Sequence, residues 1–96
     1  MKPVRPTQLA KRDLREILSQ SRKDWGVDLA ARYGAAVADG LKRIARHPDR
    51  FPAVGDSHPG LRRLRIGRHL VFYREEADAI VVVRLLHERM DWREKI

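Results

Sequence analysis

The chain has 96 residues, of which 43% are hydrophobic and 35% are charged. This composition is typical of a globular domain rather than a disordered chain, and we expect one domain that spans residues 1–96. There is no cysteine, which excludes a disulfide framework and a thiolate metal site. The net charge of +8 favours polyanionic partners such as nucleic acid, a ribosome or an acidic protein, and charge does not choose among them.

No apolar stretch approaches the roughly 20 residues that a membrane span requires. The first residues, MKPVRPTQLAKRDL, lack the apolar core of a signal peptide. We therefore expect a cytoplasmic protein with no membrane partner.

Residues 3–6, PVRP, can form only a short strand, and the two prolines place it at the edge of a sheet. Thr7 is suited to cap the helix that follows. An amphipathic helix of about 17 residues is predicted from Leu9 onward, and Gly26 is suited to end it. The positions at helical spacing are Ala10, Leu14, Ile17, Leu18, Ser21 and Trp25.

A second helix follows almost at once and ends before His47–Pro48, because a proline disfavours helix in the residue before it. Its apolar positions are Ala30, Tyr33, Val37, Leu41 and Ile44. The short link predicts a helical hairpin. Gly34 and Gly40 either allow close packing of this helix or are tolerated at a cost of about 1 kcal/mol each.

Residues 47–60 are predicted to form a surface loop, which is long for a domain of this size. Three strand-like runs follow at 61–66, 69–75 and 79–86, and their short links favour antiparallel hairpins. The last run is apolar at consecutive positions, which predicts a central strand buried on both faces. The fold class is therefore α+β: a short N-terminal strand, a helical hairpin, and a three-stranded antiparallel sheet with the helices on one face.

Several segments occur in the order found in one known family: AKRDLREI, WG, ARY, HP, PGLRRLRIGRHLVFYR and RLLHERMD. Over residues 7–92 the chain resembles the ParE toxins of the ParE/RelE superfamily, whose element order is β-α-α-β-β-β. The resemblance implies the toxin of a type II toxin–antitoxin pair that needs no cofactor. It also implies a ParD-like antitoxin partner, with DNA contacted only through that antitoxin.

The two branches of the superfamily imply different targets. The ParE branch inhibits DNA gyrase by binding, whereas the RelE branch cleaves messenger RNA on the ribosome. RelE-type sites resemble a cluster of lysines and arginines with a tyrosine in the C-terminal segment. Here Tyr33 and Tyr73 lie in positions expected for packing, and Trp92 stands where a tyrosine would serve. We therefore expect a gyrase inhibitor without catalysis, with a RelE-like endoribonuclease as the alternative and a member that has lost its toxicity as a third possibility.

Histidines offer a different route to phosphate chemistry. His69 opens one predicted strand and His87 closes the next, so antiparallel pairing would bring them together beside Arg68 and Arg89. Local hydrogen bonding of both histidines at the sheet edge is the simpler interpretation, and we favour it. No two histidines have metal-ligand spacing on one element, so no metal site is expected.

A basic set on and after the first of the three strands is a candidate docking surface for an acidic antitoxin or for the target. Its members are Arg62, Arg63, Arg65 and Arg68, and a solvated outer sheet face is the competing interpretation. Leu9 and Ile17 are docking candidates on the outer face of the first helix. Arg84, within an apolar strand, is expected to pair with a carboxylate or to open onto a groove.

The C-terminal residues form the candidate toxic surface: His87, Arg89, Met90, Asp91 and Trp92. A structural interpretation is compatible with this one. In it, Met90 and Trp92 fold back over the sheet as a lid, and Arg89 and Asp91 form a weak surface pair.

Overall fold

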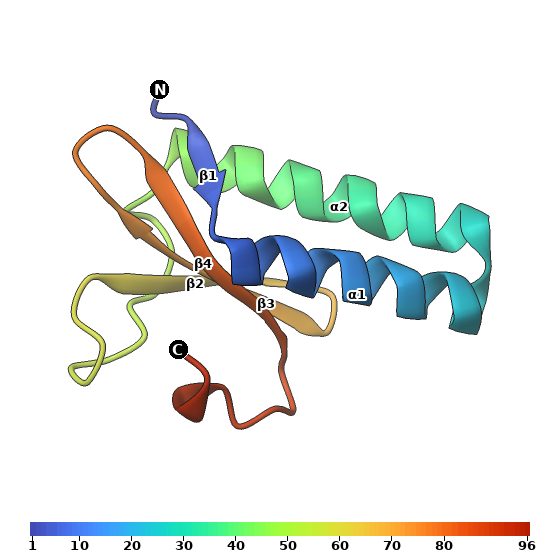
Figure 1. Ribbon diagram of the computed structural model, residues 1–96. Coiled ribbons are helices and arrows are strands. Elements are labelled where there is room, and N and C mark those ends of the chain that lie inside the picture. The colour runs from blue at the N-terminus through green and yellow to red at the C-terminus, as the bar shows by residue number, and fades with distance from the viewer.

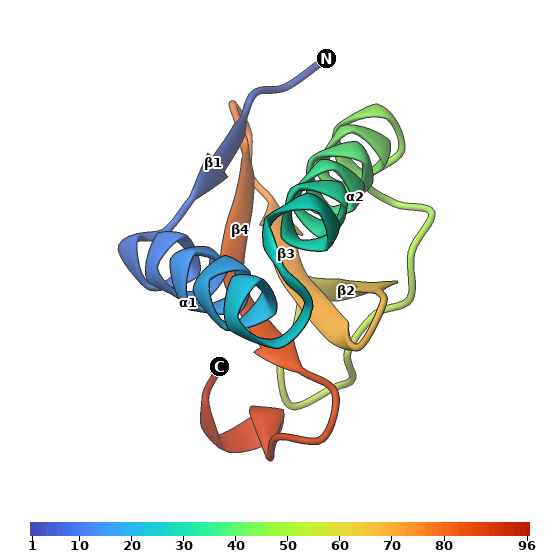
Figure 2. The ribbon, with the colours of Figure 1, turned by 90° about the vertical axis from the view of Figure 1, so that its right-hand side faces the viewer.

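The computed structural model describes residues 1–96 and shows a four-stranded sheet between a helical hairpin and the C-terminal tail (residues 88–96), as Figures 1 and 2 show. The elements are β1 (Val4–Pro6), α1 (Gln8–Trp25), α2 (Val27–Arg46), β2 (Leu61–Ile66), β3 (His69–Glu75) and β4 (Ile80–His87), followed by a 3₁₀ turn at Trp92–Glu94. The predicted order of helices and strands is thus confirmed.

The ends of α1 are set by two residues whose roles the sequence predicts. The Thr7 hydroxyl oxygen accepts a hydrogen bond of 3.1 Å from the Ala10 N–H and so caps one of the free amides of the first turn. Gly26 ends the helix with φ of 90°, a backbone conformation that glycine adopts at little cost. Because α2 begins at the next residue, the two helices form the hairpin that extends past the sheet in Figure 1.

The two glycines of α2 have different surroundings. A Cβ atom at Gly40 would overlap the Ile66 side chain and lie 3.1 Å from its Cγ1 atom. A Cβ atom at Gly34 would meet only Leu18, at 3.5 Å, which is an ordinary contact. Gly40 therefore allows α2 to pack closely on β2, whereas Gly34 is merely tolerated.

The sheet has the strand order β1-β4-β3-β2. Strands β2, β3 and β4 pair antiparallel, as predicted, and β1 adds a parallel pair along β4 that joins Val4 to Ile80 and Pro6 to Val82. The expected three-stranded antiparallel part is therefore present, and β1 extends it to a four-stranded mixed sheet. β1 lies at an edge, where a proline without an N–H is tolerated, and β4 is central, as predicted.

Both faces of the sheet are covered, by different elements. The face toward the helices carries the main core, in which Tyr73, Val71 and Ile80 pack against Val37 and Ile44. The opposite face carries a smaller cluster of Leu61, Leu70, Phe72, Leu86 and Trp92. This arrangement explains why β3 is buried at four consecutive positions, from Leu70 to Tyr73. Figure 2 shows the tail at the lower end of the molecule, with the C-terminus below α1.

The predicted loop at 47–60 is held against the sheet. Ala53 forms an antiparallel bridge with Arg62, and the Tyr73 hydroxyl donates a hydrogen bond of 2.6 Å to the Pro48 carbonyl. This buried bond confirms Tyr73 as a packing residue. No helix in the chain combines the length and apolar character of a membrane span.

Candidate functional site

The two histidines that the sequence places at strand ends meet at one edge of the sheet. His69 and His87 are direct partners in the antiparallel register of β3 and β4. Their ring centroids lie 5.3 Å apart, and the ring planes meet edge to face at 83°. The predicted pairing is therefore confirmed. Arg68 lines the cleft beside them, whereas Arg89 does not.

Tyr33 fixes the orientation and the tautomer of His69. Its hydroxyl lies 2.7 Å from the Ile66 carbonyl oxygen and 2.6 Å from His69 Nδ1. Because a carbonyl only accepts, the single hydroxyl proton goes to Ile66, and His69 Nδ1–H donates to the hydroxyl oxygen. Neutral His69 therefore carries its proton on Nδ1 and exposes a lone pair on Nε2. The expected packing role of Tyr33 is only part of its function here.

His87 has the opposite tautomer. Its Nδ1 accepts a hydrogen bond of 3.1 Å from the Arg89 backbone N–H, so neutral His87 carries its proton on Nε2. One imidazole thus offers an acceptor and the other a donor at the same edge. Local hydrogen bonding of both histidines, the interpretation we favoured, is also present.

The environment favours the neutral form of His69. Burial lowers the pKa of His69, and the neighbouring His87 lowers it further, against a smaller opposing effect of Glu88. Burial also raises the pKa of the Tyr33 hydroxyl. Near neutral pH the His69–Tyr33 pair therefore remains an uncharged hydrogen-bonded unit.

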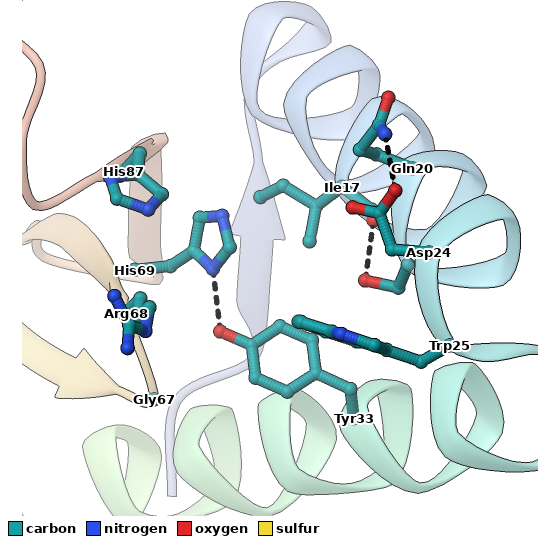
Figure 3. Close-up of a pocket in the computed structure, with 10 residues that line it drawn as sticks. Ile17, Gln20, Asp24, Trp25, Tyr33, Gly67, Arg68, His69 and His87 are labelled. Carbon is teal, nitrogen blue, oxygen red and sulfur yellow. Dashed lines mark hydrogen bonds between the residues drawn. The ribbon is translucent and has the colours of Figure 1, made fainter.

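These residues form one end of a cleft of about 330 Å³ between the sheet edge and the helical hairpin, drawn in Figure 3. The other end is built by α1, which contributes Ile17, Gln20, Ser21, Asp24 and Trp25. Gln20 and Asp24 were not singled out from the sequence. Trp25 was placed with the helically spaced apolar positions of the first helix, but 57% of its surface is exposed, so a packing role for it is wrong.

The four arginines of the predicted docking surface do not share one surface. Arg62 is half-buried and donates a hydrogen bond of 2.7 Å to the Phe51 carbonyl. Arg63 lies over the Trp92 ring on the tail side of the sheet, and Arg65 pairs with Glu88 at 3.0 Å. Arg68 lines the cleft. Strand alternation places Arg62 on one face of the sheet and Arg63 and Arg65 on the other.

The two apolar docking candidates on α1 also differ. Leu9 is 48% exposed, as a docking residue must be. Ile17 is half-buried, packs against the main core and lines the cleft, so its predicted place on the outer face of the helix is wrong. A helix twist of 100° per residue makes flank positions such as this one difficult to assign from sequence.

Arg84 has the carboxylate partner that the sequence predicts. Asp13 of α1 accepts hydrogen bonds from Arg84 Nε at 2.7 Å and from Nη2 at 2.9 Å, and its Oδ2 atom also accepts from the Leu85 N–H at 3.1 Å. The hydrogen bonds to Asp13 raise the pKa of Arg84, so the guanidinium keeps its charge. Arg84 also donates to the Lys95 carbonyl at 3.3 Å and thereby links helix, strand and tail.

The tail is partly a lid. Trp92 is buried, with its ring centroid 5.1 Å from that of Phe72, and the Arg93 guanidinium lies 4.3 Å from the indole centroid. Met90 is 45% exposed, so the expectation that it also folds over the sheet is wrong. Arg89 and Asp91 are exposed and form no ion pair, contrary to the predicted surface pair. The buried indole thus anchors a segment in which Arg89, Met90 and Asp91 are exposed to solvent.

No group of three or more His, Asp or Glu side chains is arranged to hold a metal ion. The chemistry available at the cleft is therefore that of two imidazoles, a guanidinium, a carboxylate and an indole.

The fold matches solved toxin–antitoxin structures. A chain of the chromosomal ParDE toxin–antitoxin system from P. aeruginosa superimposes with a TM-score of 0.78 at 18% identity, over 91% of this chain and 96% of that chain. A chain of the RelBE2 toxin–antitoxin complex from Mycobacterium tuberculosis gives a TM-score of 0.65 at 24% identity, over 90% and 96%. These matches define the class of fold, that of the ParE and RelE toxins.

Sequence comparison identifies the branch. The family described as ParE toxin of type II toxin-antitoxin system, parDE, matches residues 4–92. Toxin ParE1 of Caulobacter vibrioides is 37% identical over 97% of this chain and 96% of its own length. Toxin ParE of Escherichia coli is 37% identical over 88% and 84%. The chain belongs to the ParE toxin family of type II toxin–antitoxin systems.

Proposed function

We propose that the protein inhibits DNA gyrase by binding it, without catalysis of its own, and that a ParD-like antitoxin neutralises it. The observation that carries the proposal is the family match over residues 4–92, which includes the tail as far as Trp92. The gyrase target and the ParD-like antitoxin partner are both inferred from membership of this family.

The side chains support inhibition by binding more than RelE-type catalysis. In RelE-type sites, lysines and arginines are grouped around a tyrosine of the C-terminal segment. Trp92 occupies that segment here and is buried against Phe72. The Tyr73 hydroxyl is bound to a backbone carbonyl inside the protein. Neither position offers a hydroxyl to a substrate.

One observation favours the second candidate, messenger RNA cleavage. His69 and His87 present a lone pair and an N–H at the same edge, which is the requirement for a general base and a general acid. A supercoiling assay with purified gyrase, together with mapping of transcript ends after induction in cells, separates the two functions. Inhibited supercoiling without new transcript ends is expected. New ends at codon positions with active gyrase would contradict the proposal.

We place the toxic surface on the exposed part of the tail, namely Arg89, Met90 and Asp91, with His87 at its base and Trp92 as its anchor. Because Arg89 is exposed and its side chain makes no hydrogen bond, Arg89→Ala should keep stability within about 1 kcal/mol. We expect it to weaken gyrase inhibition, whereas Arg46→Ala, an exposed arginine at the end of α2, should not. Equal inhibition by both variants would show that the tail is a lid only.

We expect the antitoxin to be acidic and to cover apolar as well as basic surface. The chain carries a net charge of +8 and exposes Leu9, Trp25, Val27 and Leu29. Salt screens exposed ion pairs but does not weaken apolar burial, so the complex should survive about 1 M salt. Complete dissociation at that salt concentration would mean that the interface is electrostatic only. The cellular location that we propose remains the cytoplasm, where gyrase acts.

A further inference from the structure

We propose that the cleft between the helical hairpin and the β3–β4 edge binds a nucleotide, either free or as part of a single strand. The phosphate would lie at Arg68 and His87, and the base would lie against Trp25 with its polar edge toward Asp24. This inference goes beyond gyrase inhibition and does not rest on it, because it concerns binding to the isolated chain.

The phosphate end of the cleft has donors without partners. No hydrogen bond or ion pair within the chain uses the Arg68 guanidinium, whereas nearby Arg65 is paired with Glu88. His87 is held through Nδ1 and leaves its Nε2–H free. A guanidinium and an imidazole N–H at one edge are suited to phosphate oxygens, since charge-assisted hydrogen bonds to phosphate are among the strongest in proteins.

The middle of the cleft is aromatic. Figure 3 shows the Trp25 ring beside Tyr33, across the cleft from the histidines. The indole is 57% exposed, although a tryptophan at this position of the amphipathic helix could have been buried. Exposed indole faces stack nucleobases with little dependence on sequence. Trp25 therefore presents an exposed aromatic face on which a flat base can stack.

The α1 end of the cleft supplies acceptors. Asp24 Oδ1 accepts a hydrogen bond of 3.0 Å from Gln20 Nε2, which orients the carboxylate and leaves Oδ2 free. That oxygen suits a ribose hydroxyl or the amino group of a base. A ligand with an anion at one end and hydrogen-bond donors at the other matches this polarity.

The carboxylate also argues against an acidic peptide. A glutamate-rich segment would satisfy Arg68 but would bring further negative charge toward Asp24. The volume of about 330 Å³ falls within the range of roughly 300–1,000 Å³ for small-ligand sites. Size and polarity together favour one nucleotide over a longer polypeptide.

The test is a fluorescence titration of the purified chain, which has two tryptophans. Trp92 is buried on the other face of the sheet, so a ligand in the cleft should change the emission of Trp25. Adenosine monophosphate is expected to bind with a Kd below about 1 mM. Adenosine alone and inorganic phosphate alone should each bind at least about tenfold more weakly, because each lacks one half of the contacts.

Arg68→Gln should weaken binding of adenosine monophosphate about tenfold, and the matched control Arg46→Gln should leave it unchanged. Circular dichroism would verify that both variants fold. An oligonucleotide that binds more tightly than the mononucleotide, by an amount that Arg68→Gln removes, would assign the site to a strand. Equal or weaker binding would assign it to a free nucleotide.

The proposal is overturned if adenosine monophosphate produces no change up to about 10 mM, or if Arg68→Gln binds it as well as the unmodified chain does. A glutamate-rich peptide that binds while the nucleotide does not would also overturn it and would identify the cleft as a protein-docking site. Supercoiling inhibition is not measured in these experiments, so a negative result here leaves the proposed function standing.

Discussion

Replacement of glycine by alanine should stabilise the protein at Gly34 of α2 and should be less favourable at Gly40. Replacement of glycine by alanine in a helix gains about 0.8–1.0 kcal/mol of helix propensity. At Gly34 the new methyl group would meet only Leu18, at 3.5 Å. We therefore expect Gly34→Ala to raise the free energy of unfolding by about 1 kcal/mol, or the midpoint by roughly 4–8 °C for a domain of this size.

At Gly40 the same methyl group would overlap the Ile66 side chain and lie 3.4 Å from Leu64 Cδ2. Both neighbours are buried core residues, with 6% and 8% of their surface exposed. Overpacking of a core costs about 1–3 kcal/mol. Because the propensity gain is the same at both sites, the difference between the two variants measures this packing cost alone.

Thermal unfolding of both variants, followed by circular dichroism under identical conditions, measures the difference. Gly40→Ala should unfold at least about 4 °C below Gly34→Ala, which corresponds to 1 kcal/mol. Equal midpoints would show that Ile66 moves aside without cost. They would also refute our conclusion that Gly40 sets the distance between α2 and β2.

Three further outcomes follow. Asp13→Asn leaves the partly buried Arg84 with a weaker partner and should cost about 2–3 kcal/mol. Asp13→Leu combined with Arg84→Met should recover much of that loss. Urea unfolding tests both variants, and a cost of Asp13→Asn below about 1 kcal/mol would contradict the ion-pair argument. Trp92→Ala should cost about 3 kcal/mol because the indole is buried, and unchanged stability in urea would mean that the tail is not anchored. Burial lowers the pKa of His69, so just below the ordinary histidine pKa of about 6.5 the unfolded chain binds more protons than the folded chain, and stability should fall as pH drops through that window. His69→Asn should reduce this loss of stability in thermal midpoints measured between about pH 7.5 and 5.5. An unchanged pH dependence would contradict the assignment.

Local sequence signals were sufficient for most of the fold. Thr7 and Gly26 mark the ends of α1, and the consecutive apolar positions of β4 indicated a central strand, because these features depend on neighbouring residues. The parallel pairing of β1 with β4 could not be predicted in this way. It joins residues that are 76 positions apart, Val4 and Ile80, and a three-residue strand that ends in a proline carries little information about its partner.

The candidate site divides along the same line. Strand ends and hairpin register predicted the meeting of His69 and His87, since short links fix register. The hydrogen bond of Tyr33 to His69 was missed because helical periodicity indicates only which face of α2 is apolar. It does not indicate that the hydroxyl at the end of the Tyr33 side chain reaches the sheet. Trp25 and Asp24 were missed for a similar reason, because the hairpin extends beyond the sheet and leaves the end of α1 without a covering layer.

The most direct test of the central claim is supercoiling by purified DNA gyrase in the presence of the purified protein. Our account predicts that supercoiling falls as the protein is added and returns when the cognate antitoxin is supplied. It also predicts that Arg89→Ala inhibits less than Arg46→Ala at equal concentration. Full supercoiling at a large molar excess of folded protein would contradict the proposed action on gyrase.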